Sequence, residues 1–270
     1  MSELVVEHPG WGTTLQDAGR PGYAALGVPR SGAVDEPQRQ LLNRLLGNPP
    51  DAAVLETLGG LRVRATAPVI VATSCDHAVT VVPAGGVIVV DPLPGELWGY
   101  LAVRGGILAD PVLGSRSTES RSRLGPAPIE EGMRLRIGPD PRTPLVTDHA
   151  PPRRPDDVPI GVWPGPRVEW FGEDVLDLLT SATWTVSSET SRVGARLDGP
   201  PLRRLVDAEL PSEGVVPGAI QVPHDGRPVV MLADHPTTGG YPVVAVVDPA
   251  HLARVAQARP GSTLRFRLVR

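Results

Sequence analysis

The chain has 270 residues and a formal net charge of −4 at pH 7, and 41% of its residues are hydrophobic. Its apolar runs fall far short of the roughly 20 residues that a membrane-spanning helix needs, and no basic cluster is large enough to form a groove for nucleic acid. The single cysteine, Cys75, excludes an internal disulfide. The start, "MSELVVEHPGWGTT", lacks the charged-then-apolar pattern of a signal peptide, so a cytoplasmic location is expected.

The basic residues are unusual because all 26 of them are arginine. Without lysine the chain cannot form a P-loop, whose lysine reaches the terminal phosphates. It cannot form a Schiff base through lysine, and it cannot carry biotin on a lysine of its own. Any phosphate or carboxylate that it binds must therefore be held by guanidinium groups, hydroxyls and backbone N–H groups.

Short apolar runs of about four to seven residues recur along the chain between 30 glycines and 32 prolines. Many short strands with this punctuation predict a mostly β chain with a few helices, as a sandwich or barrel. Three segments predict helices. "DEPQRQLLNRLLGN" has Asp35 as N-cap, Gln38 as its capping-box partner and Gly47 after its last turn. "GEDVLDLLTSA" is the second, and "DPAHLARVAQARPG" is the third, capped by Asp248.

A segment rich in Pro, Asp and Arg, without hydrophobic periodicity, separates two β-rich halves. It is typical of an inter-domain connection. The sequence therefore predicts an N-terminal domain at 1–140, a connection at 141–159 and a C-terminal domain at 160–270.

Two polar constellations occur in the first half. "TTLQDAGRPGYAALGVPRSGAVD" is rich in glycine, which lets the backbone approach a ligand. "VRGGILADPVLGSRSTESRSR" follows a strand with hydroxyls and guanidinium groups that suit an anion. The alternatives are a loop held by its own Asp–Arg pair and an ordinary surface hairpin. The candidate residues of this possible second pocket are Gln16, Asp17, Arg20, Ser31, Asp35, Arg104, Ser115, Arg116, Ser117 and Thr118.

The second half contains the constellation that we expect to form the main pocket. Its segments are "SSETSRVGARLDG", "LPSEGVVPGAIQVPHDG" and "ADHPTTGGYP". Arginines beside carboxylates can stabilise a developing negative charge, although such pairs can equally be structural. The candidates for catalysis are Arg192, Arg196, Asp234 and Glu213, and those for substrate binding are Thr237, Thr238, Gly239, Gly240, Tyr241, Ser191, Ser212 and Gln221. The six histidines show no metal-ligand spacing, so no metal site is expected.

In their order along the chain, "TTLQDAGRPGYAALGVPRSGAVD", "YLAVRGGI", "LGSRST", "SRVGARL", "SEGVVPGAIQVP" and "TTGGYP" resemble one family. The sequence is similar to the C subunit of bacterial 5-oxoprolinase (PxpC), a family also called KipA or allophanate hydrolase subunit 2, which shares the carboxyltransferase domain of urea carboxylases. The resemblance implies two cyclophilin-like β-barrel domains. It also implies two partner subunits, one KipI/PxpB-like and one PxpA/LamB-YcsF-like.

The family's reaction implies ATP and Mg²⁺ at the level of the complex, a lactam substrate, and phosphorylation of the lactam oxygen before water attacks. The matching motif positions are the candidates above together with Asn43, Glu56 and Gly194. Val193 and Ala195 depart from the family's usual residues, and "LGPAPIEEGMRL" lacks the glycine-arginine pattern that normally precedes its strand. Two alternatives remain open: a carboxyltransferase-type subunit of a urea carboxylase/allophanate system, and a non-catalytic KipA-type regulator that binds a KipI-like kinase inhibitor.

Overall fold

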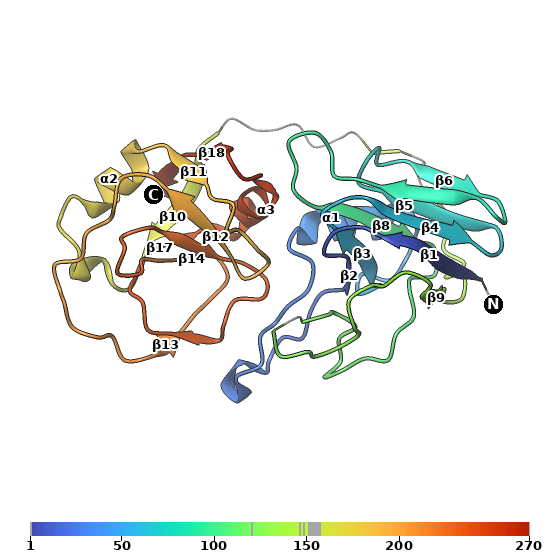
Figure 1. Ribbon diagram of the computed structural model, residues 1–270, viewed down its shortest axis with the longest axis horizontal. Coiled ribbons are helices and arrows are strands. Elements are labelled where there is room, and N and C mark those ends of the chain that lie inside the picture. The colour runs from blue at the N-terminus through green and yellow to red at the C-terminus, as the bar shows by residue number, and fades with distance from the viewer. Residues whose placement is uncertain (1, 120, 146, 148, 151–157, 270) are drawn as a thin grey trace. The chain divides into compact units, whose positions relative to one another are not determined.

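The computed structural model describes residues 2–119, 121–145, 147, 149–150 and 158–269 (Figure 1). The chain divides into two compact units. Unit 1 comprises Met1–Arg20 and Ser31–Arg154, and unit 2 comprises Pro21–Arg30 and Pro155–Arg270. The short segment Pro21–Arg30 thus groups with the C-terminal half, which its position in the sequence does not indicate. Much of the predicted connection at 141–159 lies outside the described residues.

Unit 1 contains two antiparallel sheets with a shared apolar core. One sheet has the strand order β7-β4-β1-β9 and the other β2-β3-β8-β5-β6. In β4 the burial alternates strictly, with Leu61 and Val63 inside and Arg62 and Arg64 outside, as the two-residue period of a strand requires. The strands are β1 Glu3–Pro9, β2 Thr14–Gln16, β3 Val54–Thr57, β4 Leu61–Ala65, β5 Val69–Thr73, β6 Val79–Val82, β7 Val87–Val90, β8 Gly99–Val103 and β9 Arg134–Arg136.

Unit 2 is built on one eight-stranded sheet, ordered β18-β11-β12-β15-β14-β17-β10-β19. Its two edge strands, β18 and β19, are separated in the chain by Arg265 alone, so the sheet curls until its edges almost meet. A two-stranded ribbon of β13 and β16 is set apart from this near-closed barrel (Figure 1). The strands are β10 Ile160–Pro164, β11 Trp184–Val186, β12 Gly194–Asp198, β13 Glu213–Gly214, β14 Ala219–Gln221, β15 Val229–Met231, β16 Thr238–Gly239, β17 Val243–Val247, β18 Thr263–Leu264 and β19 Phe266–Leu268.

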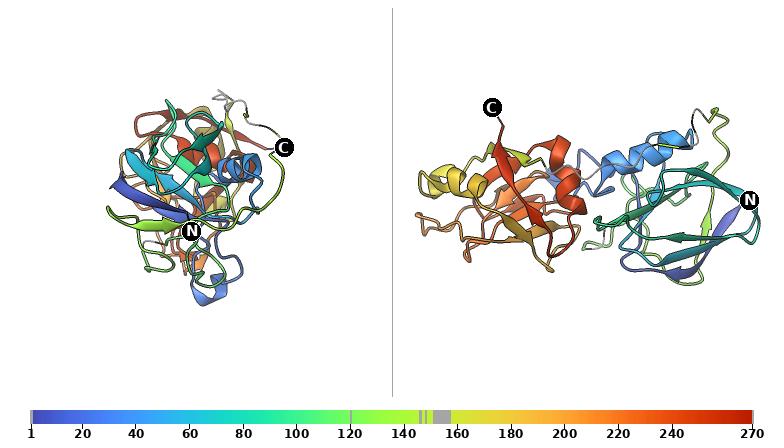
Figure 2. Two further views of the ribbon diagram at one scale, coloured as in Figure 1. Left: turned by 90° about the vertical axis from the view of Figure 1, so that its right-hand side faces the viewer. Right: turned by 90° about the horizontal axis from the view of Figure 1, so that it is seen from above.

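The three α-helices lie where the sequence predicts them. α1 (Glu36–Leu45) packs against β8 and β5, α2 (Val175–Ser181) against β19, and α3 (Pro249–Gln257) against β10 (Figure 2). Two short 3₁₀ helices, η1 (Ala24–Leu26) and η2 (Val168–Trp170), complete the described elements. The predicted fold class, mostly β with a few helices and a barrel-like sheet, is confirmed.

The capping of α1 differs in one respect from the prediction. Asp35 Oδ1 accepts a hydrogen bond from Gln38 N at 3.0 Å, as an N-cap should. The predicted reciprocal bond of the capping box, from Asp35 N to the Gln38 side chain, is wrong. Asp35 N donates to the Tyr100 hydroxyl instead (3.0 Å). The Gln38 side chain turns to His77, whose Nε2 lies 3.1 Å from Gln38 Oε1. A tertiary contact has replaced a local one.

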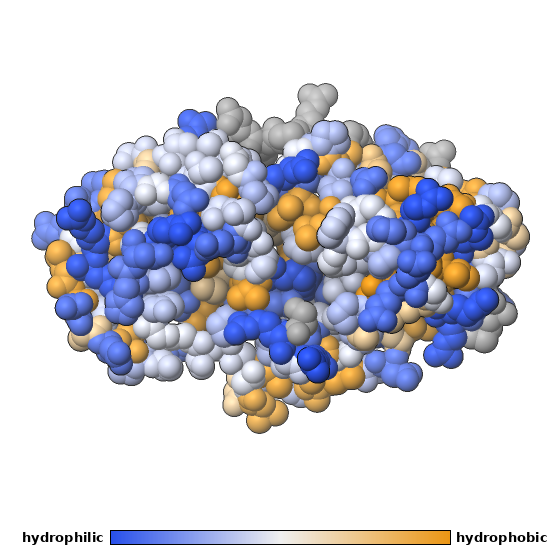
Figure 3. Space-filling view, in the orientation of Figure 1, coloured by the Kyte–Doolittle hydropathy of each residue, from blue (hydrophilic) through white to orange (hydrophobic). Residues whose placement is uncertain are grey.

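Several large apolar side chains are exposed at the surface, among them Trp11, Val81 and Leu205. Leu26, in η1, is 76% exposed. Figure 3 shows several separate hydrophobic patches among the hydrophilic residues of this face. Within the described ranges, no helix has both the length and the apolar character needed to cross a bilayer.

Candidate functional site

The Arg192–Asp234 pair is a buried ion pair. Arg192 Nε donates to Asp234 Oδ2 at 2.8 Å, and Arg192 Nη2 donates to Asp234 Oδ1 at 3.1 Å. Both side chains are almost completely buried, with 9% and 0% of their surface exposed. A backbone hydrogen bond connects the same two residues, since Asp234 N donates to Arg192 O. The guanidinium therefore clamps the segment before β12 to the segment after β15.

Arg196 pairs with different carboxylates from those that bind Arg192. Its guanidinium contacts Glu189 at 2.9 Å and Asp225 at 3.2 Å. In the β12–β15 ladder, Gly194 is opposite Met231 and Arg196 is opposite Val229. Asp234 and Asp225 therefore follow and precede β15, and the two ion pairs lie toward opposite ends of that ladder.

The β13–β16 ribbon brings together several of the other predicted residues. Glu213 pairs with Gly239, and Gly214 with Thr238. Arg167 donates to Glu213 Oε2 through Nη2 at 2.7 Å and through Nε at 3.1 Å. Glu213 Oε1, by contrast, is buried and has no hydrogen-bond partner among the described residues. The carboxylate is thus held in one orientation with one oxygen unused.

The ribbon continues toward Gln221 and Tyr241. Gln221 Nε2 donates to Tyr241 O at 3.2 Å. Gly239 lies so close to this amide that a Cβ on it would approach Gln221 Nε2 to 2.6 Å, so a larger residue here would require the Gln221 side chain to move. Thr237 binds the ribbon through its backbone oxygen, which accepts from Val215 N, while Thr238 and Tyr241 are exposed. Ser191, Ser212 and Gly240 lie at exposed positions nearby in the chain.

In unit 1, Asp17 forms the centre of a buried polar cluster. Its Oδ1 accepts hydrogen bonds from Ser115 Oγ and Ser117 Oγ, both at 2.6 Å, and from Gly19 N at 2.8 Å. Its Oδ2 accepts from Arg116 N at 2.6 Å. With all its oxygens used and only 4% of its surface exposed, this carboxylate joins the end of β2 to a distant loop.

Residues near Asp17 in the chain make further hydrogen bonds between the end of β2 and the same loop. Gln16 Nε2 donates to Thr118 O at 3.0 Å, and Arg20 Nη2 donates to Ser117 O. Ser31 has a left-handed φ of 54° and is buried next to Gly32, whose backbone packs on the Asp17–Gly19 turn. The structure thus assembles most of the predicted second pocket as a buried hydrogen-bonded cluster.

Asp35 and Arg104 lie apart from the Asp17 cluster. Asp35 begins α1 and meets Tyr100, whose hydroxyl donates to Glu56 Oε2 at 2.8 Å. Burial, together with the charge of Glu56, raises the pKa of Tyr100 well above its ordinary value. This phenol therefore stays protonated and acts as a fixed donor to Glu56.

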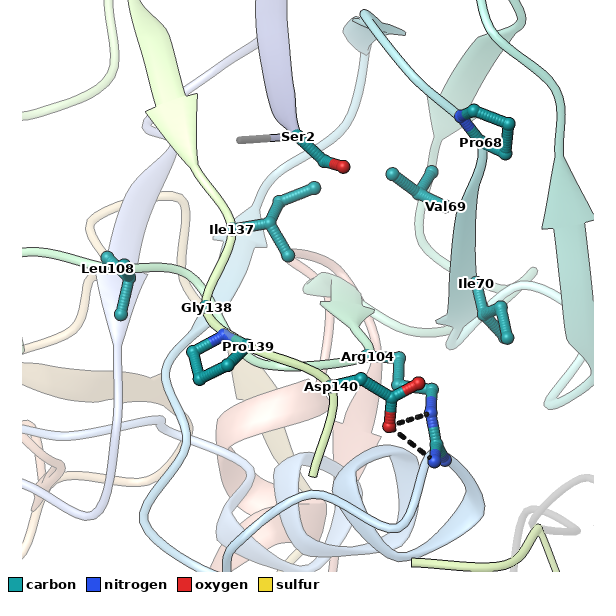
Figure 4. A pocket seen from close by; sticks show the side chains of 10 residues that line it. All are labelled: Ser2, Pro68, Val69, Ile70, Arg104, Leu108, Ile137, Gly138, Pro139 and Asp140. Atoms are coloured by element: carbon teal, nitrogen blue, oxygen red, sulfur yellow. Dashed lines mark hydrogen bonds and ion pairs between the residues drawn. The ribbon is translucent and has the colours of Figure 1, made fainter. Parts of the chain in front are cut away.

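Arg104 lies beside a cavity of about 460 Å³ (Figure 4). Its Nε and Nη2 donate to Asp140 Oδ1 at 3.1 and 2.7 Å, and its Nη1 donates to Leu46 O at 2.8 Å. Figure 4 shows this ion pair at one end and the apolar side chains of Val69 and Ile137 at the other. The hydrogen bonds of Arg104 are therefore already used, and the cavity is largely apolar.

A second cavity, of about 360 Å³, lies in unit 2 and was not predicted from the sequence. It lies between the loop after β12 and the turn that joins β14 to β15, and Arg203, Arg204 and His224 line it. The guanidinium of Arg204 is 5.8 Å from the centre of the Tyr241 ring. "PLRRLVDAEL" shows no motif or periodicity that marks a site, although its paired arginines are a visible signal of positive charge.

The described residues contain no group of three or more His, Cys, Asp or Glu side chains arranged to hold a metal ion. A Mg²⁺ ion bound together with nucleotide phosphates would need only one or two protein carboxylates, and Glu213 Oε1 is a carboxylate oxygen without a hydrogen-bond partner in the described part of the chain. Asp234 is less suitable, since Arg192 contacts both of its oxygens.

Comparison with known proteins agrees with this architecture. A family model described as the carboxyltransferase domain, subdomain A and B, matches residues 26–268. The chain belongs to this carboxyltransferase-domain family. It is 34% identical to the C subunit of 5-oxoprolinase from Escherichia coli K12, over 97% of this chain and 90% of that protein. It is 31% identical to the subunit of the same name from Haemophilus influenzae, over 95% and 88% of the two chains.

The family extends to larger proteins. A urea amidolyase of Lachancea kluyveri is 31% identical over 97% of this chain, which corresponds to 16% of that enzyme. Among solved structures, TTHA0988 matches with a TM-score of 0.89 and 33% identity, and the urea amidolyase of K. lactis with 0.87 and 28%. Each match covers 99% of this chain, which spans about half of the first structure (56%) and 19% of the second.

Proposed function

We propose that the chain is a subunit of an ATP-dependent 5-oxoprolinase complex that opens 5-oxoproline to L-glutamate. The observation that carries this proposal is the match to the C subunit of E. coli 5-oxoprolinase, which covers nearly the full length of both proteins. The partners in the proposal are a KipI/PxpB-like subunit and a PxpA/LamB-YcsF-like subunit, with ATP and Mg²⁺ required by the complex as a whole.

The chemistry starts from the low reactivity of a lactam toward water. The lactam oxygen takes the γ-phosphoryl group of ATP, and ADP leaves. Water then adds to the activated ring carbon, and the C–N bond breaks while the nitrogen takes a proton. The acyl phosphate that results reacts with a second water molecule and yields glutamate and phosphate. The protein must orient the lactam, stabilise charge on the oxygen and place a base near water.

Glu213 is the residue of this chain that we assign to the base or to Mg²⁺ binding. Arg167 fixes one carboxylate oxygen and leaves the other without a partner in the described part of the chain. Thr237 and Thr238, which lie next to it on the ribbon, orient the substrate. Arg192 and Arg196, expected from the sequence to neutralise charge, would first have to give up their present carboxylate partners.

The test is co-expression with both partner subunits, followed by assays of glutamate and ADP formation from 5-oxoproline. We expect coupled formation of the two products. Glu213→Gln should lower turnover at least about a hundredfold in an assembled complex, because removal of a catalytic base typically costs a factor of 10² or more. The matched control is Glu209→Gln, an exposed carboxylate in the same unit, which should leave turnover unchanged. A complex that assembles but produces no glutamate refutes the proposal.

A second candidate function follows from the similarity to urea amidolyase. In this alternative the chain accepts a carboxyl group from biotin carried on another chain and transfers it to urea or a related amide. Activity with urea, bicarbonate and a biotin carboxylase partner, and none with 5-oxoproline, would favour it. A tight complex with a KipI-like partner, without ATP turnover on either substrate, would favour a regulatory role.

A further inference from the structure

The cavity at Arg204 is a formed feature of unit 2. Leu202 N donates to Gly226 O at 3.0 Å and thereby fixes one wall against the other. Gly226 has a φ of 76°, and a Cβ on it would lie 2.9 Å from the Pro201 side chain, so the turn needs glycine to approach this closely. The volume of about 360 Å³ lies at the lower end of the range for small-molecule sites.

The charge of Arg204 is uncompensated within the described residues. Its Nε and Nη2 are buried and have no hydrogen-bond partner there. Nη1 is neither bonded nor among these buried atoms, and it therefore keeps accessible surface. Other arginines of this region differ, since Arg196 has Glu189 and Asp225, and Arg227 has Asp198.

The acidic groups at the cavity do not supply the missing partner. Asp225 is already bound by Arg196, and its second oxygen accepts from Arg227 N at 3.1 Å. Asp207 is exposed and lines the cavity, and within the described ranges it makes no ion pair with Arg204. Arg203 and His224 add donors, and His224 meets the Tyr241 ring edge-on at 6.0 Å between ring centres.

We propose that this cavity binds a small carboxylate or phosphate anion, with Arg204 as its main partner and Arg203 and His224 at its rim. The accessible Nη1 of Arg204 can donate a charge-assisted hydrogen bond to an oxygen of either anion. The Arg204 guanidinium also lies 5.8 Å from the centre of the Tyr241 ring, within the range of a cation–π contact. Anion binding here requires neither ATP nor a partner subunit and is therefore separate from the proposed lactam chemistry.

The test is direct titration of the full-length chain by calorimetry at low ionic strength, where charge interactions are least screened. The probes are L-5-oxoproline and L-glutamate as carboxylates and inorganic phosphate as the other class, each against a background of chloride. We expect saturable binding of at least one probe and a matching rise in melting temperature. The probe that binds more tightly identifies the anion class.

The variant Arg204→Gln should bind that probe at least tenfold more weakly. Arg259→Gln removes the same charge from an exposed position of unit 2 and should bind like the unaltered chain. If Arg204→Gln fails to fold, Arg204→Lys keeps the charge and the apolar stem, and should bind several-fold more weakly because an ammonium group does not stack on the Tyr241 ring as the planar guanidinium does. The proposal is overturned if no probe saturates, or if the folded Arg204 variants bind as tightly as the unaltered chain.

Discussion

Replacement of Asp17 by alanine is the sharpest test of the architecture of unit 1. The carboxylate accepts hydrogen bonds from two serine hydroxyls and two backbone N–H groups. The hydroxyls can rotate toward other acceptors, but the backbone donors cannot. A buried donor left without a partner costs about 1–3 kcal/mol, so we expect Asp17→Ala to lower the free energy of unfolding by about 3–5 kcal/mol. At ~2–4 °C per kcal/mol, the melting temperature should fall by roughly 6–20 °C.

The assay is thermal and urea unfolding of the purified chain, with Asp110→Ala as the control. Asp110 is exposed and begins the same loop, and its replacement should change stability by no more than about 0.5 kcal/mol. The reasoning would be refuted if Asp17→Ala lost less than about 1 kcal/mol. Such a result would mean that the cluster does not hold the loop to β2, and it would reopen Asp17 as a ligand-binding residue.

Three further predictions concern single side chains. Arg192→Ala and Asp234→Ala should each cost about 3–5 kcal/mol, and the double variant less than the sum, because each single change leaves a buried charge unpaired; additive losses in urea unfolding would contradict the pairing. Asp248→Ala should cost about 1 kcal/mol, since Asp248 Oδ1 caps α3 through Ala250 N, whereas Asp174→Ala should cost little because its side chain makes no such bond; equal losses would argue against the cap. Burial lowers the pKa of His77 below its ordinary 6.5. This effect of burial is larger than the opposing effect of the Asp76 charge, which raises the pKa. On acidification, His77 therefore takes up its proton at a higher pH in the unfolded chain than in the folded chain. The contribution of neutral His77 to the free energy of unfolding is complete above about pH 6.5 and is lost as the pH falls through the lowered pKa. His77→Asn, which tolerates the left-handed φ of 52°, should flatten this acid-side decline in melting temperature, and an unchanged pH profile would count against it.

Local signals in the sequence were sufficient for the helices and the fold class. Asp35 and Asp248 cap helices that begin one residue later, and Gly47 has the left-handed φ that the end of α1 needs. These features depend on neighbours within a few residues, so the sequence specifies them directly. The reciprocal capping bond failed because Tyr100, on a distant strand, occupies the N–H group of Asp35.

The grouping of side chains into sites required the folded chain. Arg192 and Arg196 are close in sequence, yet each pairs with a different carboxylate, on either side of β15. Asp17 and Ser117 are 100 residues apart and form a direct hydrogen bond. Arg204 belongs to no recognisable motif, and its position over Tyr241 depends on how two loops of the barrel meet.

The sequence by itself determined the β-rich class, the three helices, the family and the exclusion of lysine chemistry. These follow from composition, local capping and ordered motifs, which a linear chain displays without folding. Only the tertiary structure decided which carboxylates neutralise which arginines, and therefore which charged atoms remain available to a ligand. The reason is that ion pairs and buried donors are satisfied across strand ladders and loop contacts, where distance along the chain does not indicate distance in space.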